Sequence, residues 1–178
     1  MTIQSAFDPK SRLYRPPAHF LRGSLARFAT GVAVVTFDTE DTGDAKRHGI
    51  TVNSFTSASM DPPLVLVSLQ RTVRSHDLLG SRPYTINVLG AEQENLAMQF
   101  AGRPSLEPTW IDGERAPRLA GVLSWFECTP WATYDAGDHT IFVGEVQDFN
   151  YRSGGALGFV NGQFSTINET VHGHESLF

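Results

Sequence analysis

The sequence of the second half of the chain predicts successive β-hairpins, and this feature restricts the possible folds more than any other. Residues 121–137 and 137–149 carry apolar and β-branched stretches on either side of a turn at Asp135 to Gly137. Residues 157–167 contain Asn161 and Gly162, a dipeptide that strongly favours a two-residue hairpin turn. Strands joined by such short turns run antiparallel, so this half of the chain predicts an antiparallel sheet.

The first half adds further short strands and a few helices. Strands are predicted at 30–37, 48–55, 64–69 and 82–90, and helices at 19–29, 72–81 and 91–102. Thr72 or Ser75 could cap the second helix, and Leu96 and Phe100 share one face of the third. About seven short strands with two or three short helices predict a mainly β, closed antiparallel barrel, because closure removes exposed strand edges. A doubly wound parallel sheet is not expected, and the G-x-G-x-x-G signature is absent.

Composition narrows the class of protein. The chain has 178 residues and a net charge of −5, which fits one domain spanning 1–178 and disfavours nucleic acid and anionic membranes as partners. The single cysteine, Cys128, cannot form an internal disulfide and reads as a small buried residue on a strand. The polar start of the chain lacks the apolar run of a signal peptide, and no apolar stretch is long enough to span a membrane. We therefore expect a soluble cytoplasmic protein.

Hydroxyl and amide side chains crowd the segment 49–65. They are Thr51, Asn53, Ser54, Thr56, Ser57 and Ser59. If 49–54 is a strand, Thr51 and Asn53 share one face of it. Uncharged donors and acceptors suit the edge of a heteroaromatic ring, although a solvated loop after a strand explains the same composition.

Arginines follow the strand at 64–69. Arg71 and Arg74, with Ser75 and His76, stand at or near a predicted helix start, where phosphate groups are favoured. An ordinary solvated helix face is the alternative. His48 and His76 are lone histidines and are more often structural than catalytic.

Gly137, Asp138 and His139 open an apolar strand. Asp138 could form a turn while His139 packs at a barrel rim. A hydrolase triad is disfavoured, because no G-x-S-x-G elbow is present and adjacent side chains on a strand point to opposite faces. No metal site is expected, although the histidines at 172 and 174 have metal-like spacing in a polar tail.

Six stretches taken together resemble the flavin reductase-like family. In chain order they are RFATGVAVVTF, GITVNSFTSASMDPPLVLVSL, RSHDLL, YTINVL, QFAG and AGDHTIFVGEV. The resemblance covers roughly residues 20–167, with polar extensions on both sides. It implies a homodimer with an FMN-binding, Greek-key split-barrel fold. It also implies NADH-dependent reduction of free FAD or FMN by hydride transfer.

The family resemblance implies a role for each matching residue. Flavin contacts would come from Thr51, Asn53, Ser54, Ser57, Ala58, Ser59, Ser68, Leu69 and Gln70, with Arg74 and Ser75 at the phosphate and Phe100 and Ala101 along the ribityl or adenosine side. Arg71 could replace Arg74 at the phosphate. His139 would lie near the nicotinamide, with Asp138 orienting its loop, Gly137 allowing close approach of a dinucleotide, and Phe28, Thr30 and Gly31 bordering the pocket. No residue is expected to act as an acid or base, since positioning suffices for hydride transfer.

The implied partner is a separate oxygenase that receives reduced flavin by diffusion. The closest likeness is to reductases that serve phenol, hydroxyphenylacetate and chlorophenol monooxygenases. Two alternatives remain open. One is a flavoprotein like pyridoxamine-phosphate oxidase that retains its FMN, and the other is a flavin-binding protein without enzymatic activity. The homodimer is also expected from aromatic residues that include Trp110, Trp125 and Trp131.

Overall fold

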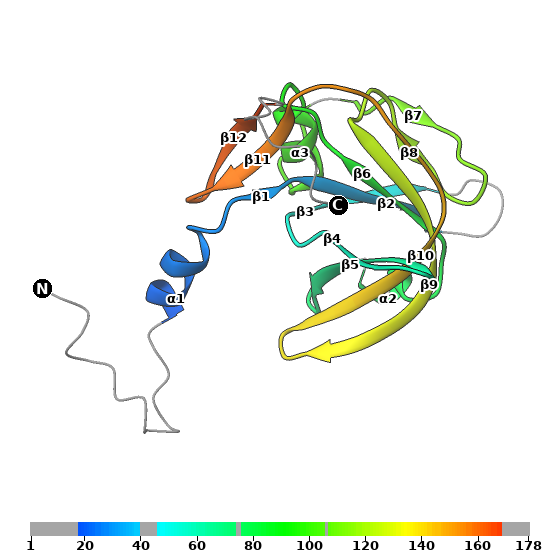
Figure 1. Cartoon of the computed structure of the whole chain (residues 1–178), viewed down its shortest axis with the longest axis horizontal. Coiled ribbons are helices and arrows are strands. Elements are labelled where there is room, and N and C mark those ends of the chain that lie inside the picture. Colours follow the sequence, from blue (N-terminus) through cyan, green and yellow to red (C-terminus); the bar gives the residue numbers. More distant parts are fainter. Residues whose placement is uncertain (1–17, 40–45, 74–75, 106, 169–178) are drawn as a thin grey trace, which may run out of the picture.

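The computed structural model describes residues 18–39, 46–73, 76–105 and 107–168. Within these ranges the protein is mainly β with a few short helices (Figure 1). The helices are α1 (Ala18–Leu25), α2 (His76–Leu79) and α3 (Glu94–Phe100). The strands are β1 (Thr30–Gly31), β2 (Ala33–Asp38), β3 (Arg47–Val52), β4 (Thr56–Met60), β5 (Pro63–Gln70), β6 (Tyr84–Val88), β7 (Trp110–Ile111), β8 (Arg118–Leu119), β9 (Ser124–Ala136), β10 (His139–Tyr151), β11 (Ala156–Val160) and β12 (Gln163–Ile167).

Seven of the strands form the main sheet. Their order is β3-β2-β6-β9-β10-β5-β4, and every pairing is antiparallel, as the hairpin pattern predicts. The hydrogen-bonded order is open, because no ladder joins β3 to β4 among the residues described. Figure 1 shows the sheet curving so that these two end strands lie near each other. The described structure therefore supports an antiparallel β fold but not a continuous ring of paired strands.

Strand β2 lies at the centre of the packing because both of its faces are buried. Ala33, Val35 and Phe37 join an apolar cluster inside the curved sheet, while Val34 joins a second cluster on the other face. This explains why the sequence here is a continuous apolar run rather than an alternating one. Helix α3 covers the second cluster, where Leu96 is buried and Phe100 packs against it, as its predicted apolar face requires.

A small sheet of order β1-β11-β12 packs beside the second cluster. Its β11–β12 hairpin turns at Asn161 and Gly162, with φ angles of 53° and 77°. Both residues at positive φ identify the turn as the mirror-image type that suits the twist of paired strands, and the predicted hairpin is confirmed. This hairpin forms one wall of the larger groove described below.

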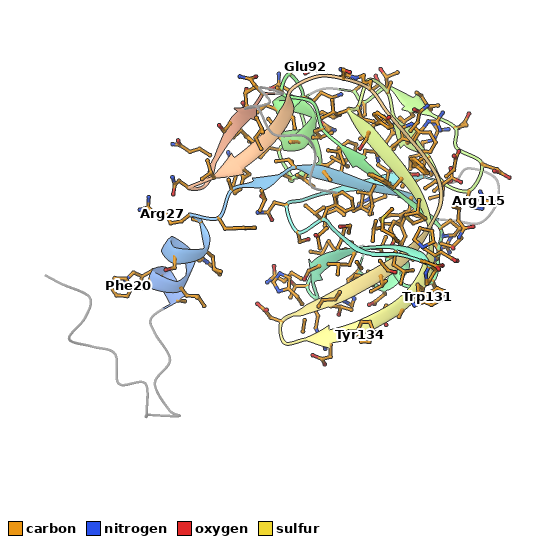
Figure 2. The ribbon with its side chains drawn as sticks, viewed as in Figure 1. Phe20, Arg27, Glu92, Arg115, Trp131 and Tyr134 are labelled. Atoms are coloured by element: carbon orange, nitrogen blue, oxygen red, sulfur yellow. The ribbon has the colours of Figure 1, made fainter. Side chains whose placement is uncertain are left out.

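Helix α1 stands away from the sheets in Figure 1, and none of its residues is buried. The predicted helix is confirmed, yet no other described element covers its apolar side chains. Phe20, Leu21, Leu25 and the following Phe28 are between 51% and 76% exposed. Figure 2 shows Phe20 at the outer side of the helix, away from the body of the protein.

Two other composition-based expectations can be compared with the structure. Cys128 is buried in β9, as expected. Of the three tryptophans, Trp131 is 53% exposed, but Trp110 and Trp125 pack against the second apolar cluster. Two of these aromatic residues therefore stabilise the fold and give no support to a dimer surface. No helix in the described ranges is long and apolar enough to cross a membrane.

Candidate functional site

A groove of about 300 Å³ lies where the ends of β3 and β5 face each other. We call it the β3–β5 groove. Its walls are Ile50, Thr51, Val52, Asn53, Ser54, Ser68, Leu69, Gln70, Val73 and His139. Apolar side chains alternate with hydroxyl and amide groups, and His139 is the one titratable side chain among these lining residues. Six of the residues predicted to contact flavin are thus brought together here.

Strand β3 ends earlier than predicted. It stops at Val52, so Asn53 and Ser54 belong to the connection to β4 and do not share a strand face with Thr51. The chain turns here because the Ser54 hydroxyl binds β5. Its oxygen accepts a hydrogen bond from the Ser68 N–H and donates one to the Ser68 carbonyl, both at 3.0 Å. Strand β4 pairs with β5 only from Pro63 to Leu66, so this edge of Ser68 would otherwise lack a partner.

A larger groove of about 700 Å³ lies beside the first, and we call it the α3 groove. It is lined by Val32, Thr51, Val52, Asn53, Glu94, Met98, Ala101, Arg103, Phe159, Gly162, Gln163 and Phe164. The two grooves share residues 51–53 as lining, so they lie on either side of the end of β3. The Thr51 hydroxyl donates a 2.6 Å hydrogen bond to the Ala97 carbonyl, which holds α3 against β3.

These contacts determine which polar groups can bind a ligand. The hydroxyl protons of Thr51 and Ser54 are already donated to protein carbonyls, so neither can donate to a ligand without breaking a scaffold contact. In the described part of the chain, no hydrogen bond is formed by the Asn53 side chain, which is exposed and lines both grooves. Asn53 is therefore the best-placed side-chain donor of the polar cluster.

His139 stands at the rim of the β3–β5 groove, as the first residue of β10. Its Nδ1 lies 2.8 Å from the Asp138 carboxylate, and the histidine side chain is 42% exposed. This hydrogen bond, together with the charge of His139, lowers the pKa of Asp138. The expectation that Asp138 and His139 point to opposite faces is wrong, because Asp138 lies in the turn and not on the strand. Among the described residues, no serine hydroxyl binds the His139 ring.

Several predicted site residues lie elsewhere. Ser57, Ala58 and Ser59 sit on edge strand β4 and do not line either groove, and the Ser59 hydroxyl accepts a bond from the Asp61 N–H. Phe28 and Thr30 do not line the grooves either. The same holds for Gly31, Gly137, Asp138 and Phe100, although Ala101 lines the α3 groove. Arg74 and Ser75 lie outside the described residues, so their predicted phosphate role stays a prediction, and the Ser75 cap with it.

The lone histidines have structural contacts. His48 packs its ring against Phe37, with centroids 5.4 Å apart. The His76 Nε2 lies 2.7 Å from the Thr140 hydroxyl, and its ring packs edge-on against Phe142. His76 therefore ties α2 to β10. No group of three or more His, Cys, Asp or Glu residues could hold a metal ion in the described ranges, and the histidines at 172 and 174 lie outside them.

Sequence reasoning missed the far wall of the α3 groove. Phe159, Gln163 and Phe164 come from the β11–β12 hairpin, which the sequence identified as a hairpin but not as part of a site. Arg103 also lines this groove and follows the QFAG motif directly, so its position next to a recognised motif was the available signal. Val73, which lines the β3–β5 groove, was also missed, although it stands two residues after Arg71, which was considered for the phosphate.

Comparisons with known proteins identify the family to which the chain belongs. The family model for the flavin reductase like domain matches residues 25–168. The FMN reductase (NADH) SmoA of Agrobacterium fabrum is 43% identical over 176 residues, covering 94% of this chain and 99% of the relative. An NADH-dependent flavin reductase of a Rhodococcus species is 40% identical over 157 residues, covering 85% and 86% of the two chains.

The solved structure of the styrene monooxygenase flavin reductase of Pseudomonas putida S12 superimposes with a TM-score of 0.76. It is 33% identical and covers 85% of this chain and 99% of the other. Residues 25–168, which the family model matches, contain both grooves and the turn that carries His139. The chain described here therefore belongs to the family of proteins with a flavin reductase like domain.

Proposed function

We propose that this protein is an NADH-dependent flavin reductase that supplies reduced flavin to a separate flavin-dependent aromatic monooxygenase. Family membership supports the activity, and the similar protein from Pseudomonas putida is named as the reductase of a styrene monooxygenase. The observation that carries the proposal is the β3–β5 groove, where uncharged donors and acceptors meet apolar walls and a single histidine stands at the rim.

The lining of the groove fits a flavin. A flat heteroaromatic ring needs apolar contact on its faces and hydrogen-bonding groups at its edge. Ile50, Leu69 and Val73 can supply the first, and Asn53 can supply the second. The α3 groove provides room for the rest of the molecule, with Arg103 as a cation for phosphate. Both grooves open to solvent, which suits a flavin that enters and leaves as a substrate.

The chain contributes positioning to the reaction. The two substrates supply the redox chemistry, a hydride transfer from the nicotinamide to the flavin. In the part of the groove that the structure describes, no carboxylate or lysine faces the ring position, so we assign no residue as an acid or base. Asn53 orients the flavin, and His139 holds the nicotinamide amide or phosphate, with Asp138 fixing the orientation of the histidine ring.

The proposal extends to the assembly. The chain forms one split-barrel domain, in which the contact of Ser54, after β3, with Ser68 of β5 bridges the gap between the ends of the sheet. Two copies form a homodimer in which the exposed apolar face of α1 is covered. Exposed apolar side chains gathered on one helix support this, since burying them is favourable. We place the enzyme in the cytoplasm, where NADH is available.

The first experiment mixes purified protein with NADH in air, with and without added FMN or FAD, and follows the NADH absorbance. Rapid loss that requires added flavin is the expected result. Activity with a flavin that survives dialysis would instead favour a retained-FMN oxidoreductase. Flavin binding without NADH oxidation would overturn the proposal in favour of a binding protein. Sedimentation at the assay concentration measures the dimer, and a stable monomer would refute that part.

A further inference from the structure

The turn between β9 and β10 is tied to the loop that follows β5. Among the described residues of this loop, Arg71 makes three contacts that join them. Its backbone N–H donates to the Asp138 carbonyl at 3.0 Å, its Nη2 lies 2.6 Å from the Asp135 carboxylate, and its Nε donates to the His139 carbonyl at 3.4 Å. The loop after β5 is therefore held to the turn by contacts of Arg71, which lies just beyond the last paired residue of β5.

Asp135 completes the connection from the other side. One carboxylate oxygen accepts a 3.0 Å hydrogen bond from the Gly137 N–H, while the other faces the Arg71 guanidinium. The Gly137 bond first, and then Arg71, lower the pKa of Asp135, so this carboxylate stays charged at neutral pH. Gly137 has a φ of +75° and open space around it. The backbone of His139 is already paired with Gln70 and Ala136, so the Arg71–Asp135 pair adds a side-chain contact that restrains the turn residues directly before His139.

We propose that Arg71 is a positioning residue for the nicotinamide substrate. With Asp135 it forms a latch that holds residues 137–139 at the rim of the β3–β5 groove. This inference rests on the proposed function for its substrate. It also assigns Arg71 a role other than binding flavin phosphate, because the guanidinium is already engaged by the Asp135 carboxylate and the His139 carbonyl.

The exposure of the pair separates this role from a purely structural one. The Arg71 and Asp135 side chains are 44% and 77% exposed, and exposed ion pairs contribute little to the stability of a fold. Loss of the latch should therefore leave the protein folded. The proposed flavin contact at Asn53 comes from the connection after β3 and does not pass through the latch. We therefore expect the KM for NADH to change and the KM for flavin to stay the same.

The test compares Arg71→Ala, Arg71→Lys and Asp135→Asn with wild type in steady-state NADH oxidation, varying NADH and flavin separately. We expect the KM for NADH to rise about fivefold in Arg71→Ala and in Asp135→Asn, with the flavin KM unchanged. The double variant should be no worse than either single one, because both remove the same contact. Arg71→Lys should restore part of the loss, since lysine keeps the charge but not the bond to the His139 carbonyl. Arg47→Ala, which breaks an exposed ion pair with Asp112 at the other end of β3, is the matched control.

Two results would overturn the latch. One is an unchanged KM for NADH in Arg71→Ala, and the other is a rise in the flavin KM alone, which would place Arg71 at the flavin phosphate. Amide hydrogen exchange at Gly137 reports on the latch and does not depend on enzymatic activity. We expect this exchange to be about fivefold faster in Arg71→Ala and in Asp135→Asn. If wild type fails to oxidise NADH, the proposed function falls while the exchange measurement still judges the latch. Unchanged exchange would refute it.

Discussion

Replacing Ser54 by alanine should loosen the seam of the sheet. The Ser54 hydroxyl satisfies both the N–H and the carbonyl of Ser68 on an edge that β4 no longer covers. Without it, two partly buried backbone groups lose their partner. Each hydrogen bond contributes about 1 kcal/mol net, and water can reach this open groove, so we expect a loss of about 1–2 kcal/mol in the free energy of unfolding. For a chain of this size that lowers Tm by about 3–6 °C.

The same change should weaken flavin use, because Ser54 and Ser68 both line the β3–β5 groove. We expect the KM for flavin to rise about threefold to tenfold as the two walls move apart. Urea unfolding followed by tryptophan fluorescence measures the first effect, and NADH oxidation at varied flavin measures the second. Ser165→Ala, at an exposed serine of β12, is the control. A Ser54→Ala protein with wild-type Tm and wild-type flavin KM would show that the bridge has no role in holding the groove.

Three further predictions concern single positions. His139→Ala should raise the KM for NADH about fivefold and leave the flavin KM unchanged in steady-state kinetics; a normal NADH KM would remove its assigned role. Gly144→Ala should cost about 1–3 kcal/mol in urea unfolding, because the new methyl group would overlap the buried Tyr84 hydroxyl. That hydroxyl has no hydrogen-bond partner in the described structure, so Tyr84→Phe should recover part of the loss; full additivity would contradict the overlap. Burial raises the pKa of Cys128 to about 12, so only the unfolded thiol ionises near pH 8.5, and stability should fall by about 2 kcal/mol as the pH rises from 8.5 to 10. Unfolding of Cys128→Ala should show a smaller slope with pH, and an equal slope would refute the assignment.

Local patterns predicted the elements of this fold well. The run 64–69 became β5 (Pro63–Gln70), in which Val65, Val67 and Leu69 are buried and alternate with more exposed neighbours. The turn at Asn161 and Gly162 formed where the dipeptide required it. These features depend on residues close together in the chain, so a single sequence contains the information that specifies them.

Features that depend on residues far apart in the chain could not be predicted from local sequence patterns. The end of β3 at Val52 follows from the position of β5, since Ser54 leaves the strand to bind Ser68. The apolar stripe of α1 predicted a helix correctly, but the pattern could not show that this helix would remain exposed among the described elements. Strand periodicity predicted that the side chains of Asp138 and His139 point to opposite faces. That prediction assumed that both residues lie on the strand, whereas Asp138 lies in the turn and its carboxylate contacts His139.

The site lies where the regular sheet ends, which explains both its chemistry and the limit of prediction. Inside the sheet, backbone groups satisfy one another and leave nothing for a ligand. Where the ladder ends, side-chain contacts connect the elements: Ser54 binds Ser68 across the gap between β3 and β5, Thr51 joins β3 to Ala97 of α3, and Arg71 joins the loop after β5 to Asp135 at the end of β9. Because the hydroxyl protons of Thr51 and Ser54 are used in these contacts, both residues are scaffold, and Asn53 is left available for a ligand. A groove held by a few single contacts can open and close at low cost, which a reductase that releases its flavin requires.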